Sequence, residues 1–276
     1  MTNILVGSCS WTDPALVRSG WYPRGRRDAE GRLRYYAERF PVVEVDGTFY
    51  ALPSERNSLL WVERTPPGFT FDVKAYASLT GHPVNQPAAP DEVWARFAAG
   101  IGPLRAAGRL GGVLFQFPPW FRPGVRAERF LEETAERTAG WPVHVEFRHP
   151  DWWEERQRDL TCALLGKYGF AAVGVDMVQG LPATLPPLTP VTTPRQSVVR
   201  FHGRSTSWGR GSKEERFRYD YRRAELAEWV PRLRELAERV DRLHVLFNNC
   251  CGAAAVQAAE TMADLLSPRS APSSSR

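Results

Sequence analysis

The sequence predicts an α/β protein built as one (β/α)8 barrel. Eight short apolar segments alternate with segments of helical periodicity along the 276 residues, a usual length for such a barrel. Most of the apolar segments carry charged residues at alternate positions near their carboxyl ends. Because successive side chains of a strand point to opposite faces, one face is apolar and the other is charged. This pattern is typical of a closed barrel with helices on its outside and a polar site inside one end.

In the predicted strands, residues at alternate positions form two faces: one face carries branched or aromatic residues, and the other carries polar or charged residues near the carboxyl end of the strand. Glu44 and Asp46 share one parity with Thr48 in the second strand, and Arg200 shares one with His202 in the seventh. The opposite parity is held mainly by valine and phenylalanine, which suit the outer surface of a barrel. In chain order, the strands are residues 4–9, 42–48, 69–75, 111–117, 143–149, 171–176, 197–203 and 244–249.

Segments with apolar residues at helical spacing separate these strands, and several follow Pro, Asp or Gly. They are residues 32–40, 54–65, 91–107, 126–139, 156–168, 222–239 and 253–266. The sixth crossover, from Asp176 to Ser197, contains too many prolines for a regular helix, so we expect an irregular connection there. One barrel domain is predicted for residues 1–266, followed by a disordered tail of residues 267–276.

The composition is ordinary for a globular protein, with 43% hydrophobic and 24% charged residues. No apolar run is long enough to cross a membrane, and the first residues do not resemble a signal peptide, so we expect no membrane association. The four cysteines form no disulfide framework, which predicts a cytoplasmic location. The net charge of +5 leaves nucleic-acid binding open without indicating it, and nothing in the sequence indicates an oligomeric state.

Polar residues at the strand ends are predicted to form a site, because the carboxyl ends of barrel strands meet at one mouth. Unpaired buried charges are costly, so we expect a polar cavity or, alternatively, a network of structural ion pairs. The candidates for acid–base catalysis are Glu44, Glu146 and His202, and His202 is expected to titrate near neutral pH. The candidate substrate-binding residues are Asp46, Tyr50, Lys74, Gln116, Arg148, Asp176, Arg200, Asn248 and Asn249.

The ordered motifs EVDGTFYALP, FDVKA, LFQFPP, VEFRHPDW, VRFHG and FNN resemble those of the YecE-like family of bacterial and archaeal barrel proteins. The resemblance extends from about Val6 to Leu265 and implies a TIM-type barrel, in a family regarded as a domain of unknown function. Three positions depart from the family pattern. Asp46-Gly47 replaces a usual Asn-Ser pair, Cys9 replaces a typical glycine, and Cys250 replaces a common histidine. The resemblance therefore predicts the fold and leaves the activity open.

Arg148, Arg200 and Lys74 suit a phosphate or carboxylate group, so we predict a small anionic ligand, such as a phosphorylated sugar or a nucleotide-like compound. An enzyme is favoured, with hydrolase, isomerase or lyase chemistry. Lys74 could form a Schiff base or be a structural lysine paired with a carboxylate. No cofactor is predicted, although carboxylates and His202 at the mouth leave a divalent metal open.

The alternative function is non-catalytic binding of nucleic acid by an aromatic, arginine-rich rim that includes Trp208, Arg204, Arg210 and Lys213. The loop after the seventh strand is rich in glycine and serine and is the candidate lid. The helix after Gly252 could offer its first amides to a phosphate. Cys9 and Cys250 end the first and last strands, which are neighbours in a closed barrel, so these thiols could approach each other.

Overall fold

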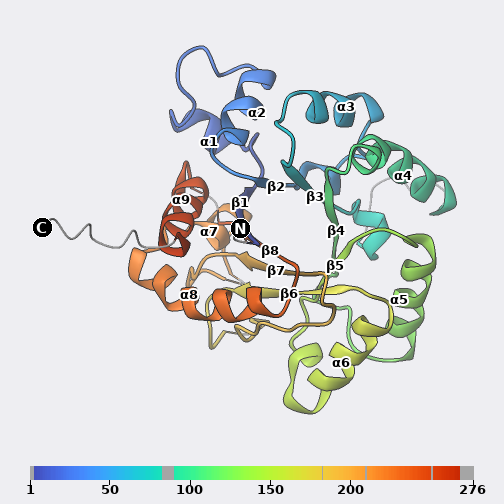
Figure 1. Cartoon of the computed structure of the whole chain (residues 1–276). Helices are drawn as coiled ribbons and strands as arrows, with labels where there is room; N and C mark the ends of the chain where they lie inside the picture. Colours follow the sequence, from blue (N-terminus) through green and yellow to red (C-terminus); the bar gives the residue numbers. More distant parts are fainter. Residues whose placement is uncertain (1–2, 83–89, 182, 209, 250, 268–276) are drawn as a thin grey trace, which may run out of the picture.

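The computed structural model describes residues 3–82, 90–181, 183–208, 210–249 and 251–267. Eight parallel strands form a closed barrel in sequence order, and β8 pairs with β1. Figure 1 shows the strands at the centre with the helices around them. The strands are β1 (Ile4–Cys9), β2 (Val42–Val45), β3 (Thr70–Lys74), β4 (Leu110–Gln116), β5 (Val143–Glu146), β6 (Ala171–Asp176), β7 (Gln196–Phe201) and β8 (Arg242–Phe247). The predicted (β/α)8 barrel is confirmed.

The helices occupy the crossovers between the strands. The α-helices are α1 (Pro14–Arg18), α2 (Ala29–Ala37), α3 (Glu55–Glu63), α4 (Pro90–Ala106), α5 (Val125–Arg137), α6 (Glu155–Lys167), α7 (Lys213–Phe217), α8 (Arg223–Glu238) and α9 (Ala254–Leu266). Short 3-10 helices follow three strands: η1 (Gly47–Phe49), η2 (Ala77–Thr80) and η3 (Pro150–Trp153). Within the described ranges, no helix has the combined length and apolar character that a membrane crossing requires.

Three connections test the sequence-based expectations most directly. We predicted one helix before β2, but α1 also forms there, because Asp13 accepts hydrogen bonds from Ala15 and Leu16 and Pro14 suits the first helical position. We predicted no helix in the loop after β7, yet Ser212 and Glu215 form a capping box that starts α7. The sixth crossover contains no helix among its described residues, as its prolines predicted.

The outer face of the barrel packs against the helices, and its inner face carries the charges. Val43, Val73 and Phe147 are fully buried on the outer face. Phe147 stacks on Trp152 of η3 with a centroid separation of 3.9 Å and an interplanar angle of 6°. This apolar layer fixes the strands, so that the alternate residues necessarily point into the barrel.

The lower interior of the barrel contains a cluster of buried polar side chains. His244 Nδ1 lies 2.7 Å from Asp72 Oδ2, and both residues are fully buried together with His144. A β-bulge in the β3–β4 pair brings two glycines next to this cluster. A Cβ on Gly112 would lie 2.2 Å from ring atoms of His144, so only glycine leaves room for that imidazole.

We expect Gly112→Ala to destabilise the fold by about 1–3 kcal/mol, because the added methyl group overlaps the His144 ring. Gly102→Ala is the matched control: no atom lies within 4 Å of its Cβ position in α4, so this change is expected to be neutral or stabilising. Urea denaturation measures both. In a double-mutant cycle with His144→Ala, the two changes should couple by at least about 0.5 kcal/mol, and strict additivity would contradict this account.

Candidate functional site

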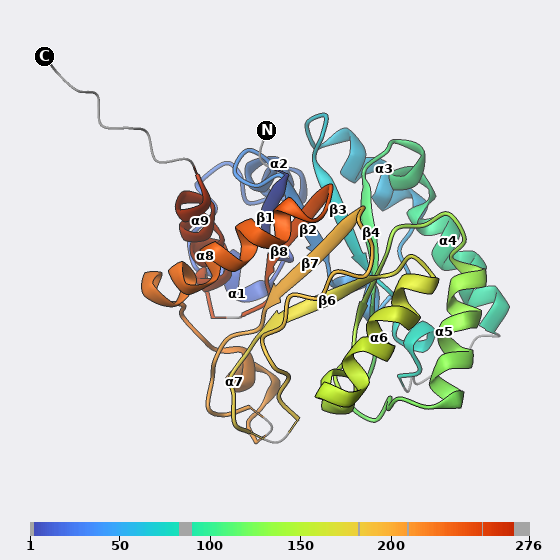
Figure 2. The ribbon, with the colours of Figure 1, turned by 60° about the horizontal axis from the view of Figure 1, so that its bottom comes forward.

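A cavity of about 620 Å³ opens where the strands end. The loop that carries α7 lies at this end of the barrel, opposite the N-terminus (Figure 2). The cavity is lined by strand-end residues and by the segments that follow β1, β2, β4, β6, β7 and β8, with Ser8, Cys9, Ser10, Asp13, Leu16, Asp46, Phe49, Tyr50, Lys74, Gln116, Pro119, Arg148, Ala183, Trp208, Arg216, Phe217, Asn248, Asn249, Gly252, Ala255 and Val256.

Beneath the cavity, Arg200 of β7 holds two glutamates on opposite sides of the barrel. Its Nε and Nη2 donate to Glu44 of β2 at 2.9 and 2.6 Å, and its Nη1 donates to Glu146 of β5 at 2.5 Å. All three side chains are at most 1% exposed. Bidentate pairing of this kind orients both partners, so the three residues form a rigid base for the cavity.

Glu146 is shared with two further groups. Arg148 Nε lies 2.5 Å from Glu146 Oε1, and His202 Nε2 lies 3.2 Å from the same oxygen. Asn248 Nδ2 lies 3.0 Å from His202 Nδ1. A neutral imidazole satisfies both contacts if its Nε2–H donates to Glu146 and its Nδ1 accepts from Asn248.

The protonation states follow from burial and from these neighbours. Burial and the Arg148 charge lower the pKa of His202 to about 3, so His202 is neutral at pH 7. The expectation that His202 titrates near neutral pH is therefore wrong. Although burial alone would raise it, Arg148 and Arg200 hold the pKa of Glu146 well below its usual range. Glu146 thus stays ionised as the common partner of two guanidinium groups.

At the cavity floor, two cations converge on one neutral oxygen. Gln116 Oε1 accepts from Lys74 Nζ at 3.1 Å and from Arg148 Nη2 at 3.2 Å. Lys74 Nζ also lies 4.5 Å from the centroid of the Phe49 ring. Among the described residues, no carboxylate lies within ion-pair distance of this amine, so the predicted pairing of Lys74 with a carboxylate is wrong.

Among the described residues, the cations at the floor outnumber the carboxylates that pair with them. Lys74, Arg148 and Arg200 bring three positive charges, whereas the ion pairs of the two arginines use Glu44 and Glu146, and a further carboxylate, that of Asp46, lines the same cavity. Burial raises the pKa of Glu44, and any protonation of that carboxylate would enlarge the imbalance. Burial together with the Arg200 and Arg148 charges lowers the pKa of Lys74 to about 8. Lys74 is thus a cavity group able to exchange a proton near neutral pH.

The same positive field reaches His82, which contacts the rings of Phe49 and Trp120. Burial and the charges of Lys74 and Arg148 lower the pKa of His82 to about 4. The pKa values of two histidines and one lysine around the cavity floor are therefore all lowered, first by burial and then by neighbouring positive charges.

The upper part of the cavity holds polar atoms that lack partners among the described residues. Asn249 is 3% exposed; its Nδ2 donates to Tyr219, whereas its Oδ1 has no donor. Arg216 Nε on α7 likewise has no acceptor. Helix α9 begins without a side-chain cap, and its first-turn residues Ala255 and Val256 line the cavity, which places the positive end of the helix dipole there.

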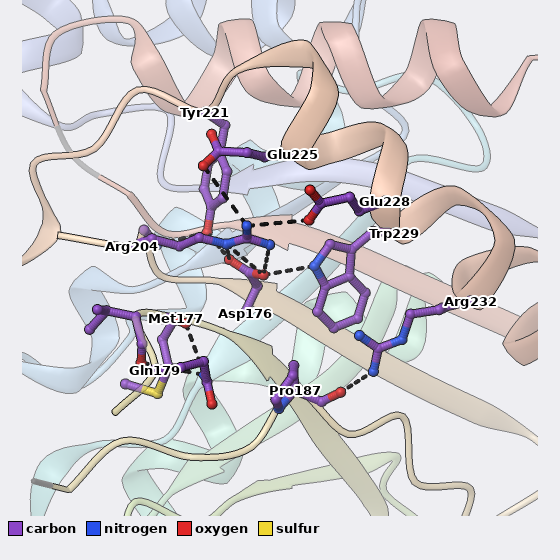
Figure 3. Close-up of polar contacts among 12 residues, drawn as sticks. Asp176, Met177, Gln179, Pro187, Arg204, Tyr221, Glu225, Glu228, Trp229 and Arg232 are labelled. Carbon is purple, nitrogen blue, oxygen red and sulfur yellow. Dashed lines mark hydrogen bonds and ion pairs between the residues drawn. The ribbon is translucent and has the colours of Figure 1, made fainter. Parts of the chain in front are cut away.

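Asp176 does not belong to this cavity, although we predicted it as a binding residue. Its carboxylate accepts from Tyr221 at 2.6 Å, from Trp229 Nε1 at 2.7 Å and from Arg204 Nη2 at 2.7 Å. Figure 3 shows these donors surrounding Asp176, with Trp229 coming from α8 outside the barrel. Asp176 therefore points outward, and it anchors the base of the loop between β7 and α8.

The structure brings most of the predicted site residues together, at two depths. Asp46, Tyr50, Lys74, Gln116, Arg148, Asn248 and Asn249 line the cavity. Glu44, Glu146, Arg200 and His202 lie beneath it and are buried. Sequence patterns do not distinguish Arg216 from the other arginines of its loop, or identify Phe49 as the ring beside Lys74. Cys250 lies outside the described residues, so its approach to Cys9 stays a prediction.

No group of three or more His, Cys, Asp or Glu side chains in the described part of the chain is arranged to hold a metal ion. The predicted carboxylate ligands are instead engaged with arginines, since Glu44 and Glu146 pair with Arg200, and Asp176 pairs with Arg204. A site for a divalent ion at the mouth would have to displace these guanidinium groups.

The fold and the polar mouth define a TIM-type barrel protein. A family model described as "Protein of unknown function DUF72" matches residues 5–275, and the chain belongs to this family. UPF0759 protein YunF of Bacillus subtilis strain 168 is 31% identical over 271 residues, which cover 95% of this chain and 94% of YunF. UPF0759 protein YecE of Escherichia coli K12 is 29% identical over 159 residues, or 57% of this chain and 53% of YecE. The predicted YecE-like resemblance is confirmed.

Solved structures of the same family share the fold. A DUF72 family protein from Thermotoga maritima MSB8 superposes with a TM-score of 0.82 at 31% identity, covering 95% of this chain and 98% of that one. A DUF72 family protein from Enterococcus faecalis V583 gives a TM-score of 0.86 at 24% identity, covering 95% of each chain. These likenesses support the barrel architecture.

We expect Glu146→Gln to lower the free energy of unfolding by about 3–5 kcal/mol, because two buried guanidinium groups lose their shared carboxylate. Glu133→Gln is the matched control, since Glu133 forms an exposed i,i+4 pair with Arg137, and removal of such a pair should change stability by less than about 1 kcal/mol. Urea denaturation distinguishes the two. Similar losses in both variants would show that the buried network contributes little.

The reactivity of Lys74 toward trace amounts of acetic anhydride should rise to half its maximum near pH 8, where its amine loses its proton. Lys167 is the internal control: it is exposed, and its hydrogen bond with Tyr168 raises its pKa, so its reactivity should rise at higher pH. Peptide mass spectrometry separates the sites, because the chain has only three lysines. Coincident pH profiles for Lys74 and Lys167 would contradict the proposed depression of the Lys74 pKa.

Proposed function

We propose that the mouth cavity binds a small organic anion whose charged group sits against Lys74 and Arg148. One observation carries this proposal: both cations donate to a single neutral amide oxygen, Gln116 Oε1, at the floor of the cavity. The carboxylates below the floor are already engaged by Arg200. A bound anion would place a negative charge directly against these two cations, and carboxylate or phosphate oxygens match their donors.

The ligand also carries hydrogen-bond donors, such as hydroxyl groups. Among the described residues, no donor reaches the buried Asn249 Oδ1, and Asn249 lines the same cavity. Arg216 Nε and the uncapped start of α9 provide further positive character toward the rim. A volume of about 620 Å³ lies within the range of small-molecule sites. These features favour a hydroxylated anion, such as a phosphorylated sugar or a nucleotide-like compound.

We further propose that the protein is an enzyme acting by proton transfer, in the hydrolase, isomerase or lyase class. Lys74 is the favoured proton carrier, because it lines the cavity and its pKa of about 8 is near neutrality. Glu44, Glu146 and His202 instead serve as positioning residues that hold Arg148 and Arg200 in place. The free cysteines Cys9, Cys162 and Cys251 agree with a cytoplasmic location, which is part of the same proposal.

The alternative, a nucleic-acid-binding rim, receives less support from the geometry. Arg204, one of its expected cations, is held by Asp176 instead of projecting from the rim. Trp208 turns toward the cavity, where its ring lies 5.9 Å from the guanidinium carbon of Arg148. These two residues are therefore engaged within the protein, whereas a stacking platform requires rings that are open to bases.

Inorganic phosphate, phosphorylated sugars and hydroxy acids should raise the Tm of the wild-type protein if the cavity binds anions. Lys74→Met should weaken binding of the best of these ligands by about 10- to 100-fold, the value of one charge-assisted hydrogen bond. Wild-type affinity should also fall as pH rises through about 8, because the ammonium form of Lys74 binds the anion. Isothermal titration at pH 7 and pH 9 measures both effects.

Lys167→Met is the matched control, since it removes an exposed lysine on α6 far from the cavity lining and should leave affinity unchanged. A short single-stranded DNA belongs in the same screen at two salt concentrations. Stabilisation by DNA alone, with a steep salt dependence, would overturn the anion-pocket proposal in favour of the rim. Equal anion affinity in wild type and Lys74→Met would remove Lys74 from the site.

A further inference from the structure

Resting on the anion site proposed above, we infer that Lys74 is a nucleophilic amine that forms a Schiff base with the carbonyl group of a small oxo acid. The inference deepens the proposed function, because it names a substrate class and a covalent role for one residue of the cavity floor. It depends on the surroundings of the amine, on the distribution of charge beneath it and on the position of Arg148.

The surroundings of Lys74 suit an amine that is held in place without being neutralised. Its hydrogen-bond acceptor is the Gln116 amide oxygen, and the Phe49 ring covers another side at 4.5 Å. Neither group carries a negative charge that would stabilise the ammonium form as an ion pair. The amine nevertheless lines the cavity, so a ligand can reach it.

The charge beneath the cavity acts in the same direction. Arg200 engages both buried glutamates, and Arg148 shares Glu146 with it. Neither guanidinium group gives up its proton in a protein. Of the three cations at the floor, Lys74 is therefore the one that can lose its positive charge by deprotonation. Cationic neighbours and a partly apolar setting are known means of activating a lysine nucleophile.

The position of Arg148 selects the substrate class. Lys74 Nζ and Arg148 Nη2 contact the same oxygen atom, at 3.1 and 3.2 Å, so the two nitrogens lie no farther apart than the sum of these distances. A 2-oxo acid carries its carboxylate directly next to its carbonyl carbon. With the carboxylate against Arg148, the carbonyl carbon lies on the side of the amine. A neutral aldehyde lacks the group that Arg148 would hold.

The step balances without any other reagent. The lone pair of the Lys74 nitrogen forms the new C–N bond while the carbonyl π pair moves onto oxygen. The oxygen takes up the two protons that nitrogen loses and leaves as water when the C–O bond breaks. The product is an imine of Lys74, and its protonated form withdraws electrons from the neighbouring carbon.

The test uses the wild-type protein with glyoxylate and sodium cyanoborohydride at pH 7.5, followed by peptide mass spectrometry. Reduction converts the imine to a stable secondary amine, and the mass shift identifies which of the three lysines has reacted. We expect Lys74 to be modified at least tenfold faster than exposed Lys167, and excess inorganic phosphate to slow the modification of Lys74 only. Propanal, a neutral aldehyde, should modify Lys74 much more slowly than glyoxylate does.

Equal modification of Lys74 and Lys167 by glyoxylate would overturn the inference. Equal rates for propanal and glyoxylate at Lys74 would overturn the oxo-acid assignment. The proposed function is judged separately: if phosphate stabilises the wild type but not Lys74→Met while glyoxylate is not trapped, the anion site stands and the covalent role is wrong. If phosphate does not slow the trapping of glyoxylate at Lys74, the two anions do not share a site, and the premise of the inference is contradicted.

Discussion

The bridge from Glu44 through Arg200 to Glu146 is the interaction on which the rest of the site depends. It joins β2, β7 and β5 across the barrel, where most barrels of this kind contain branched apolar side chains. Its geometry is well matched, with a bidentate contact on one side and a short contact on the other. Because the bridge uses both buried glutamates, it also decides which cations above it lack a partner. The same interaction therefore provides the base of the cavity and its electrostatic character.

The electrostatic character follows from an unequal division of charges. Arg148 shares Glu146 with Arg200, so that one carboxylate serves two guanidinium groups, while Lys74 donates to the neutral amide of Gln116. Such an interior has two ways to lower its energy: it can bind an anion, or it can release the proton of its lysine. Both responses use the same group. The proposed anion site and the proposed amine nucleophile would thus both follow from one arrangement, and ligand binding and proton uptake are expected to be linked.

The alternation of side chains along each strand made much of this site predictable from the sequence. It did not predict which face of β6 points inward or how deep each residue lies in the barrel. On β2, β5 and β7, charged residues alternate with valine or phenylalanine, so Glu44, Glu146 and Arg200 had to share the inner face. On β6 the alternation pairs valines with Gly174 and Asp176, and the valines point inward. The partners of Asp176 lie 28 to 53 residues farther along the chain, where sequence patterns give no information about contact. Depth within the barrel was equally inaccessible from sequence, because it depends on strand stagger.

The outward orientation of Asp176 also affects the charge at the cavity floor. Had Asp176 faced the mouth, it would have supplied a further carboxylate near Lys74 and Arg148. Instead it accepts from Arg204, Tyr221 and Trp229 on the outer side, where it fixes the base of the loop that carries α7 (Figure 3). That loop places Trp208 and Arg216 over the cavity. The Asp176 carboxylate thus anchors the loop whose residues line the cavity. It therefore does not neutralise the positive charges of Lys74 and Arg148 at the cavity floor.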